Sequence, residues 1–237
     1  MENIMDLDML AGSWPIRPAD ISVPRLLGMM EHHEVAEGCV ASARGIFYDD
    51  LAGNSETLAW CEAEPRLVPV GTIDLRRFTG YRDEIRRLTA AGVKLWRLFP
   101  EYQGWSFDHA PFRRVLSALE DAGAVLFVYG QPSVVAAATA GARVPVIVGT
   151  HFYQMADLLA LMEEGTHFYV STRQLHGPGV LETLVSEFGP ERLIFGSGAP
   201  LSALGAALKG ITAADLAPDV RQAILGGNLR RLLGREP

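Results

Sequence analysis

Two carboxylates near the start of the chain have a spacing that could support acid and base chemistry. Asp6 and Asp8 stand two residues apart within the apolar segment Ile4–Leu10, and side chains two apart on a β-strand point to the same side. Neighbouring carboxyl groups can have pKa values that are pushed apart, so that one is an acid and the other a base. Alternatively, one of them binds a loop amide or pairs with an arginine. We favour this structural role for Asp6 and leave both roles open for Asp8.

A positive charge is expected inside the protein at Arg97, which lies among apolar neighbours in KLWRLF. An unpaired buried guanidinium is very costly, so Arg97 must have an anionic partner. That partner is either a ligand carboxylate, bound by two parallel hydrogen bonds, or an acidic residue such as Asp8.

Other polar side chains follow later strand-like segments. Tyr129 and His151 could donate hydrogen bonds to a ligand or act as general acids, and a structural role is the alternative for both. Arg173 and His176, in STRQLHG, and Ser197, in FGSGA, are predicted ligand contacts. Ser197 is not predicted to be a nucleophile, because its surroundings lack the Gly-x-Ser-x-Gly elbow.

The segment PEYQGWSF adds aromatic side chains after Arg97. Tyr102, Trp105 and Phe107 could form a roof over a ligand pocket, or could pack as an ordinary loop against the next helix. We favour the roof, because loops at the carboxyl ends of parallel strands usually carry function.

Short apolar segments typical of buried parallel strands recur along the whole chain. We predict strands at Ile4–Leu10, Gly38–Ser42, Leu67–Ile73, Val93–Phe99, Val125–Tyr129, Val144–Gly149, His167–Ser171 and Arg192–Gly196. We predict helices at Pro24–Glu34, Ser55–Glu64, Tyr81–Ala91, Pro111–Ala122, Pro132–Ala140, Gln154–Glu164, Pro178–Phe188, Leu201–Lys209 and Asp219–Leu233.

This alternation fits a closed (β/α)8 TIM barrel or an open doubly wound α/β sheet. No Gly-x-Gly-x-x-Gly motif follows the first predicted strand, which argues against a dinucleotide-binding sheet. The sequence therefore predicts a single barrel domain over residues 1–237, with its site at the carboxyl ends of the strands.

The composition excludes several classes of function. The formal net charge of −7 argues against nucleic acid as a partner, and no run of 18 apolar residues indicates a membrane span. Cys39 and Cys61 have no metal-binding spacing. The first ten residues do not resemble a signal peptide, so we expect a protein of the cytoplasm.

Three segments resemble amidohydrolase-related proteins. GPERLIFGSGAPL followed by RQAILGGNLRRLLG is similar to the end of that family, which has a Phe-Gly-Ser-Asp motif and an Ile-Leu-Gly-Gly-Asn helix. MDLDMLAGSWP resembles its opening strand, Asp-x-His-x-His with a Gly-x-Trp-Pro turn, and VKLWRLFPEYQGWSFDHAPFRRVL resembles its fourth strand and following helix. The resemblance implies a TIM barrel in which a divalent metal activates water or assists decarboxylation.

The ligand positions implied by this resemblance have mostly changed. The two histidines of strand one, the histidine of strand five and the aspartate of strand eight fall on Asp8, Leu10, Tyr129 and Gly198. Since catalytic zinc normally needs three protein ligands, we expect neither a metal nor another cofactor. The strand-six histidine position falls on Thr150, with His151 one residue later.

Three functions follow, in order of preference. The first is a barrel that has lost the metal and binds a small carboxylate or carbonyl compound, or a partner protein. The second is a metal-independent hydrolase or lyase that uses Asp8, Tyr129, His151 and Arg97. The third is a metal-dependent hydrolase with unconventional ligands for zinc, such as Asp6, Asp8 and His151. A homo-oligomer is compatible with all three.

Overall fold

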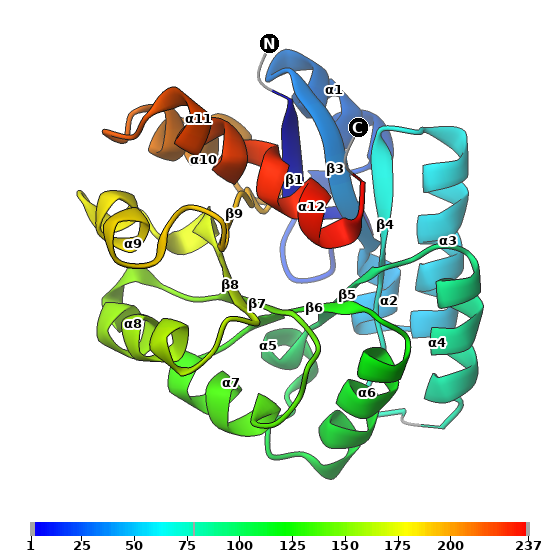
Figure 1. Cartoon of the computed structure of the whole chain (residues 1–237). Helices are drawn as coiled ribbons and strands as arrows, with labels where there is room; N and C mark the ends of the chain where they lie inside the picture. The colour runs from blue at the N-terminus through cyan, green and yellow to red at the C-terminus, as the bar shows by residue number, and fades with distance from the viewer. Residues whose placement is uncertain (1–2, 78, 236–237) are drawn as a thin grey trace.

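The computed structural model describes residues 3–77 and 79–235, which form parallel strands around a common centre with helices outside (Figure 1). The parallel strands are β1 (Ile4–Ser13), β3 (Val35–Ser42), β4 (Leu67–Gly71), β5 (Leu95–Leu98), β6 (Val125–Tyr129), β7 (Val146–Gly149), β8 (Phe168–Ser171) and β9 (Leu193–Ile194). The short strand β2 (Asp20–Ile21) pairs antiparallel with the end of β1. Each parallel strand pairs with the next one along the chain, as the βα repeat predicts.

The first and last parallel strands meet through the segment that follows β9. The backbone N–H of Leu7 donates to the carbonyl of Phe195 at 3.0 Å, and that of Leu10 donates to Ala199 at 3.0 Å. The residue numbers increase together on both segments, from Leu7 with Phe195 to Leu10 with Ala199, as in a parallel pair. The predicted single-domain TIM barrel is therefore confirmed.

Eight helices alternate with these strands and cover the outside of the barrel (Figure 1). They are α1 (Val23–His32), α3 (Asp50–Ala63), α4 (Tyr81–Ala90), α6 (Ala110–Asp121), α7 (Pro132–Thr139), α8 (Met155–Glu164), α9 (Val180–Phe188) and α10 (Leu204–Thr212). Short helical turns lie in the loops after the strands: α2 (Ala43–Phe47), α5 (Pro100–Gln103), η1 (Phe152–Gln154) and η2 (Thr172–Gln174).

Several predicted boundaries were wrong for local reasons. Helix α3 begins at Asp50 instead of Ser55, because the carboxylate of Asp49 accepts a hydrogen bond from the amide of Ala52 at 3.0 Å and caps the helix. Strand β1 continues to Ser13 because it pairs with β2. The predicted final helix is α11 (Pro218–Gln222), a π-helical turn η3 (Ala223–Gly227) and α12 (Asn228–Leu233).

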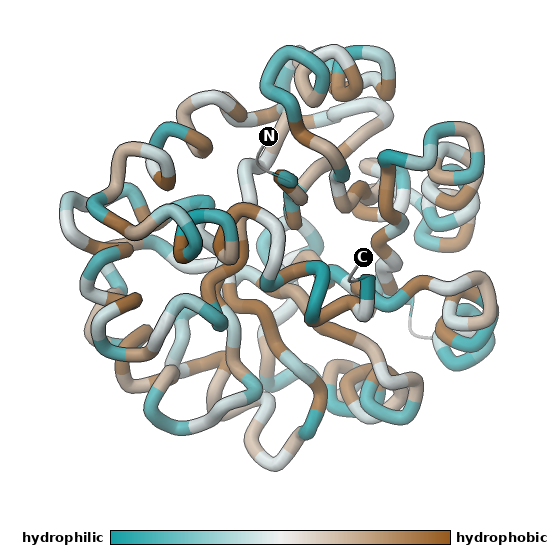
Figure 2. The backbone as a smooth tube through the Cα atoms, turned by 45° about the horizontal axis from the view of Figure 1, so that its top comes forward, coloured by the Kyte–Doolittle hydropathy of each residue, from teal (hydrophilic) through white to brown (hydrophobic). Residues whose placement is uncertain are grey.

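The apolar core has two layers because the strands alternate their side chains. In β6, Val125 and Phe127 belong to the barrel interior, while Leu126 and Val128 pack under the helices. Figure 2 shows the hydrophobic strands in brown at the centre, with hydrophilic teal segments on the surrounding helices.

Helix α12 covers the amino-terminal end of the barrel. The guanidinium of Arg230 donates to the carbonyl of Asn3 at 2.6 Å, and Leu229 and Leu233 belong to the interior cluster. The opposite end, where the strands terminate, is left to the loops. No helix within the described residues is long and apolar enough to span a membrane.

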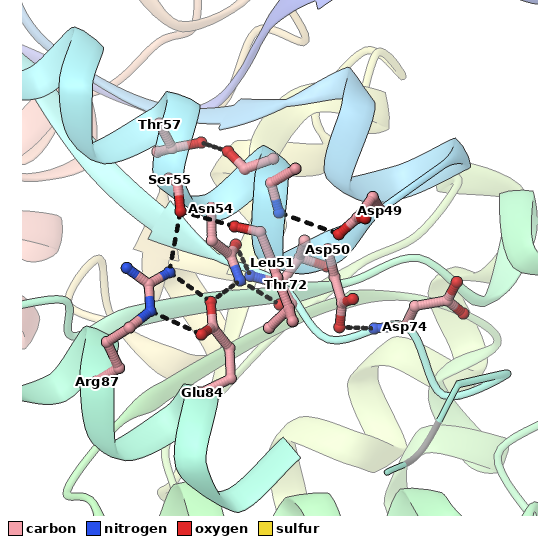
Figure 3. Close-up of polar contacts among 12 residues, drawn as sticks. Asp49, Asp50, Leu51, Asn54, Ser55, Thr57, Thr72, Asp74, Glu84 and Arg87 are labelled. Carbon is pink, nitrogen blue, oxygen red and sulfur yellow. Dashed lines mark hydrogen bonds and ion pairs between the residues drawn. The ribbon is translucent and has the colours of Figure 1, made fainter. Parts of the chain in front are cut away.

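A buried polar clamp joins α3, the end of β4 and α4 (Figure 3). The side-chain amide of Asn54 donates to the carbonyl of Thr72 at 2.9 Å and to Glu84 at 2.8 Å, and it accepts from the amide of Thr72 at 3.0 Å. Arg87 pairs with Glu84 through two hydrogen bonds of 2.8 Å. The clamp holds the loop after β4 against α3 and α4.

Candidate functional site

Asp8 is the centre of the polar network inside the barrel mouth. Its side chain is buried, and it pairs with Arg97 from β5 through one carboxylate oxygen. The other oxygen accepts hydrogen bonds from the hydroxyl of Tyr129, at the end of β6, and from the guanidinium of Arg173, in η2, both at 2.8 Å. One carboxylate is therefore shared by two arginines and a tyrosine.

The network holds its members in fixed protonation states. Burial alone would raise the pKa of Asp8, but the charges of Arg97 and Arg173 and the Tyr129 hydroxyl together lower it. Burial, together with the negative charge of Asp8, raises the pKa of Tyr129. Asp8 is thus an anion and Tyr129 a neutral phenol at neutral pH.

Asp6 lies two residues before Asp8 on β1, and it accepts hydrogen bonds from the protein backbone. One of its oxygens accepts from the amides of Asp8 at 2.9 Å and Ser197 at 3.0 Å. Its other oxygen is buried and has no hydrogen-bond partner among the described residues. Burial raises the pKa of Asp6 to about 6, although hydrogen bonds from Ser197 and Asp8 oppose the rise. The pKa values of the two carboxyl groups do move apart, mainly through burial and the arginines.

Glu101 in α5 is a member of this environment that sequence reasoning missed. Its carboxylate lies 3.7 Å from Arg97 and is partly exposed, and burial raises its pKa despite the arginine. Its position in the loop directly after the predicted strand of Arg97 was a usable signal.

Bulky side chains fill the space at the positions that the family resemblance assigns to metal ligands. Gly198 has a φ of +74°, and a Cβ there would overlap the guanidinium of Arg173. A Cβ at Gly149 would overlap the ring of Tyr129. Leu10 packs in the interior cluster. Within residues 3–77 and 79–235, no group of three or more His, Cys, Asp or Glu side chains is placed to hold a metal ion, so the donor set does not fit the metal site of the family.

A cavity of about 330 Å³ opens beside this network at the barrel mouth. It is lined by His151, Phe152, Arg173, Gln174, His176, Ser197, Ser202, Ala203, Ala206 and Ala207. Arg173 is the one residue that belongs both to the Asp8 network and to the cavity wall, and its guanidinium also donates to the hydroxyl of Ser202 at 3.3 Å.

The cavity brings together four predicted site residues, namely His151, Arg173, His176 and Ser197. Thr150, by contrast, is buried and bonds to Gln154. The residues that sequence reasoning missed on this wall are Phe152, Gln174, Ser202 and the alanines of α10. Their residue types carry no chemical signal, and only the fold places them together.

The other predicted contacts lie outside this cavity. Arg97 is 3% exposed and stacks over the rings of Phe99 and Phe127, at 4.4 and 4.9 Å, in addition to pairing with Asp8. Arg97 therefore pairs with Asp8, one of its two predicted partners.

The predicted aromatic roof needs correction for Trp105 and Phe107, which pack against the next helix, as the alternative predicted. Trp105 packs against Phe107 and Phe112, with ring centroids 5.7 Å away in both cases, and belongs to the layer under the helices. Tyr102 packs against the interior cluster of the barrel beside Trp14, with ring centroids 5.3 Å apart. The loop folds this way because the indole N–H of Trp105 finds its acceptor in Gln103 at 2.9 Å.

Several solved structures share this fold over nearly their whole length. A candidate 2-pyrone-4,6-dicarboxylic acid hydrolase from Pseudomonas putida is 19% identical, with a TM-score of 0.82 over 100% of this chain and 99% of its own. A 5-carboxyvanillate decarboxylase from Sphingomonas paucimobilis is 15% identical, with a TM-score of 0.78 over 99% of each chain. A dihydroxybenzoic acid decarboxylase from Polaromonas sp. JS666, with bound manganese and the inhibitor 2-nitroresorcinol, is 12% identical, with a TM-score of 0.79 over 99% of this chain and 97% of its own.

Sequence comparison adds the family. No curated protein sequence gives a significant match. The sequence profile described as amidohydrolase matches residues 9–235, nearly the whole chain. The protein therefore belongs to the amidohydrolase family.

Proposed function

We propose that this protein binds a small carboxylate in the cavity at the barrel mouth, with Arg173 as the anion-binding residue and without the metal of its family. The single observation that carries the proposal is the position of Arg173, on the wall of the cavity and next to a carboxylate that it shares with Arg97. Arg97 has a second carboxylate nearby, Glu101 at 3.7 Å, whereas Arg173 shares Asp8 with Arg97, and this favours a ligand anion beside Arg173.

The shape and lining of the cavity support this role. Its volume of about 330 Å³ lies within the range of sites for small molecules. Alanines and Phe152 supply an apolar wall, and histidine, serine and glutamine side chains add hydrogen-bonding groups. The structural neighbours named above are a dicarboxylic acid hydrolase and decarboxylases of aromatic acids, so carboxylate ligands suit this fold.

The absence of the metal is part of the proposal and is supported by the donor set. At the positions of the family ligands stand Leu10, Tyr129 and Gly198, and the space is filled by Arg173 and the Tyr129 ring. The remaining donor, Asp8, is occupied by two cations that would repel a third.

A metal-independent hydrolase or lyase is the second candidate. His151 and His176 line the same cavity as Arg173, and histidine is the side chain that enzymes use most often for proton transfer. We rank binding first because Asp8 and Tyr129, the other predicted catalytic groups, keep fixed protonation states near neutral pH.

A thermal-shift comparison of propionate and benzoate with their amides tests the proposal. A carboxylate at ~100 times its dissociation constant should add roughly 2.7 kcal/mol of stability, and the neutral amide should add far less. Arg173→Gln should abolish the shift, whereas the control Arg143→Gln, on an exposed side chain paired with Glu120, should keep it. Equal shifts for acids and amides, or an unchanged shift in Arg173→Gln, would reject the proposal.

A further inference from the structure

A second cavity of about 490 Å³ continues from the first along the surface. The two share His176 and Ala206 in their walls, so they adjoin at these residues. The second cavity runs between α10 and the segment from Leu175 to Leu181, away from Arg173. Together they form one groove with a charged inner end.

One wall of this groove is a smooth face of α10. Ala206 and Gly210 lie four residues apart on this helix, with Ala203 and Ala213 at its two caps, and all four are exposed, so no long side chain of this row blocks the path. The nine residues of α10 measure ~14 Å, which sets the length of this wall.

The facing wall is mainly apolar. Leu175 and Leu181 are buried beneath the groove, and Pro178 lies on its wall between two glycines. Glu182 and Lys209 are the two charged residues that line the second cavity, and no arginine lines it. The groove therefore has its arginine at the inner end, and most of the residues along the rest of its length are apolar.

We infer that the ligand is a carboxylate with an elongated apolar tail, whose head binds Arg173 and whose tail passes His176 and lies along α10. This inference rests on the proposed function and narrows its ligand class. A straight alkyl chain suits the groove, because the wall of α10 is long, narrow and free of hydrogen-bonding side chains up to Lys209. A short acid would fill only the inner cavity.

Chain length gives the expected measure. A fully buried methylene strengthens binding about fourfold, and a chain half covered by an open groove should gain about twofold per methylene. In calorimetric titrations, the affinity should therefore rise steadily from butyrate through hexanoate to octanoate, until the chain passes the end of α10.

A tryptophan at the outer part of the groove tests the path of the tail. Gly210→Trp should weaken octanoate binding at least tenfold while leaving butyrate unchanged, because only the longer chain reaches that part of the wall. Thr212→Trp is the matched control, since Thr212 is exposed on the same helix and lines neither cavity. It should leave both affinities unchanged, and thermal unfolding of each variant checks that the fold is kept.

The outcomes separate the two proposals. Butyrate and octanoate binding with equal affinity, or Gly210→Trp leaving octanoate unaffected, would overturn the elongated tail and keep the carboxylate site. Octanol binding as tightly as octanoate would overturn the carboxylate head. Failure of every acid to bind would overturn both.

Discussion

Asp8, Arg97 and Arg173 form the charged centre of the site, and their burial makes each dependent on the others. Asp8 and Arg97 are 1% and 3% exposed, so neither charge is hydrated by bulk water. Removing one member of a buried ion pair lowers the free energy of unfolding by more than the pair as a whole contributes to it, because the partner charge is left buried and uncompensated. Tyr129 donates a further hydrogen bond to the same buried carboxylate.

Replacing Asp8 tests this dependence. Asp8→Asn should lower the free energy of unfolding by about 3–5 kcal/mol, because Arg97 and Arg173 lose their shared anion. Asp83→Asn is the control: its pair with Arg86 is exposed, and its loss should cost less than about 1 kcal/mol. Urea denaturation measures both, and an Asp8→Asn loss no larger than the control would show that the pair is unimportant.

Asp6 should make stability depend on pH. Its pKa rises from 3.8 to about 6 on folding, so between these values the folded state holds a proton that the unfolded state has lost. This stabilisation is complete only well below the unfolded pKa of 3.8 and is lost progressively as the pH rises from there through 6. Relative to Asp6→Asn, the wild type should lose about 2.4 kcal/mol between pH 4 and pH 7.5. Parallel stability curves for the two proteins would contradict the raised pKa.

Gly198 and Arg173 should be energetically coupled. Gly198→Ala introduces a Cβ at positive φ that also overlaps the arginine, so it should destabilise the wild type more than it destabilises Arg173→Ala. We expect a coupling energy of about 1 kcal/mol or more in a double-mutant cycle of unfolding free energies. Strict additivity would show that Arg173 does not require the glycine.

Sequence reasoning reached the chemistry of these residues but only part of their arrangement. The strand spacing of Asp6 and Asp8 and the apolar neighbours of Arg97 were enough to predict buried charges that seek partners. Which partner each one takes depends on strands far apart in the chain, and no local pattern contains that information. Arg173 was therefore predicted only as a ligand contact, although it also binds Asp8 at the centre of the site.

At the scale of elements, the loops after the strands build the site and the clamp between α3, β4 and α4 holds one of them. The eight parallel strands were predictable from runs of apolar residues, because each is covered on both faces. The short helices α2 and α5 were not predicted, since helices of one turn depend on tertiary contacts more than on propensity.

The clamp makes a prediction of its own. Asn54→Ala removes the partner of the Thr72 backbone and one partner of Glu84 (Figure 3), and it should lower the free energy of unfolding by about 2–3 kcal/mol. Glu62→Ala, on an exposed side chain of the same helix outside the clamp, should cost less than about 1 kcal/mol. A chemical denaturation series compares them, and equal effects would mean that the clamp is not a stabilising unit.

At the scale of the whole molecule, the barrel has the architecture of its family, and we propose that its mouth carries different chemistry. Closure between β1 and the segment after β9 places Asp6, Asp8 and Ser197 together, and α12 covers the far end. The carboxyl ends of the strands are thus the open end, and the cavity beside Arg173 lies there. A guanidinium takes the electrostatic role that a divalent cation has in metal-dependent relatives, which is the central claim of our proposal.

Calorimetric titration of octanoate, in chelator and again with added zinc or manganese, tests this claim most directly. If Arg173 supplies the positive charge, the dissociation constant and the stoichiometry of one ligand per chain should be the same in all three buffers. Binding that disappears in chelator and returns with one equivalent of metal would contradict the account.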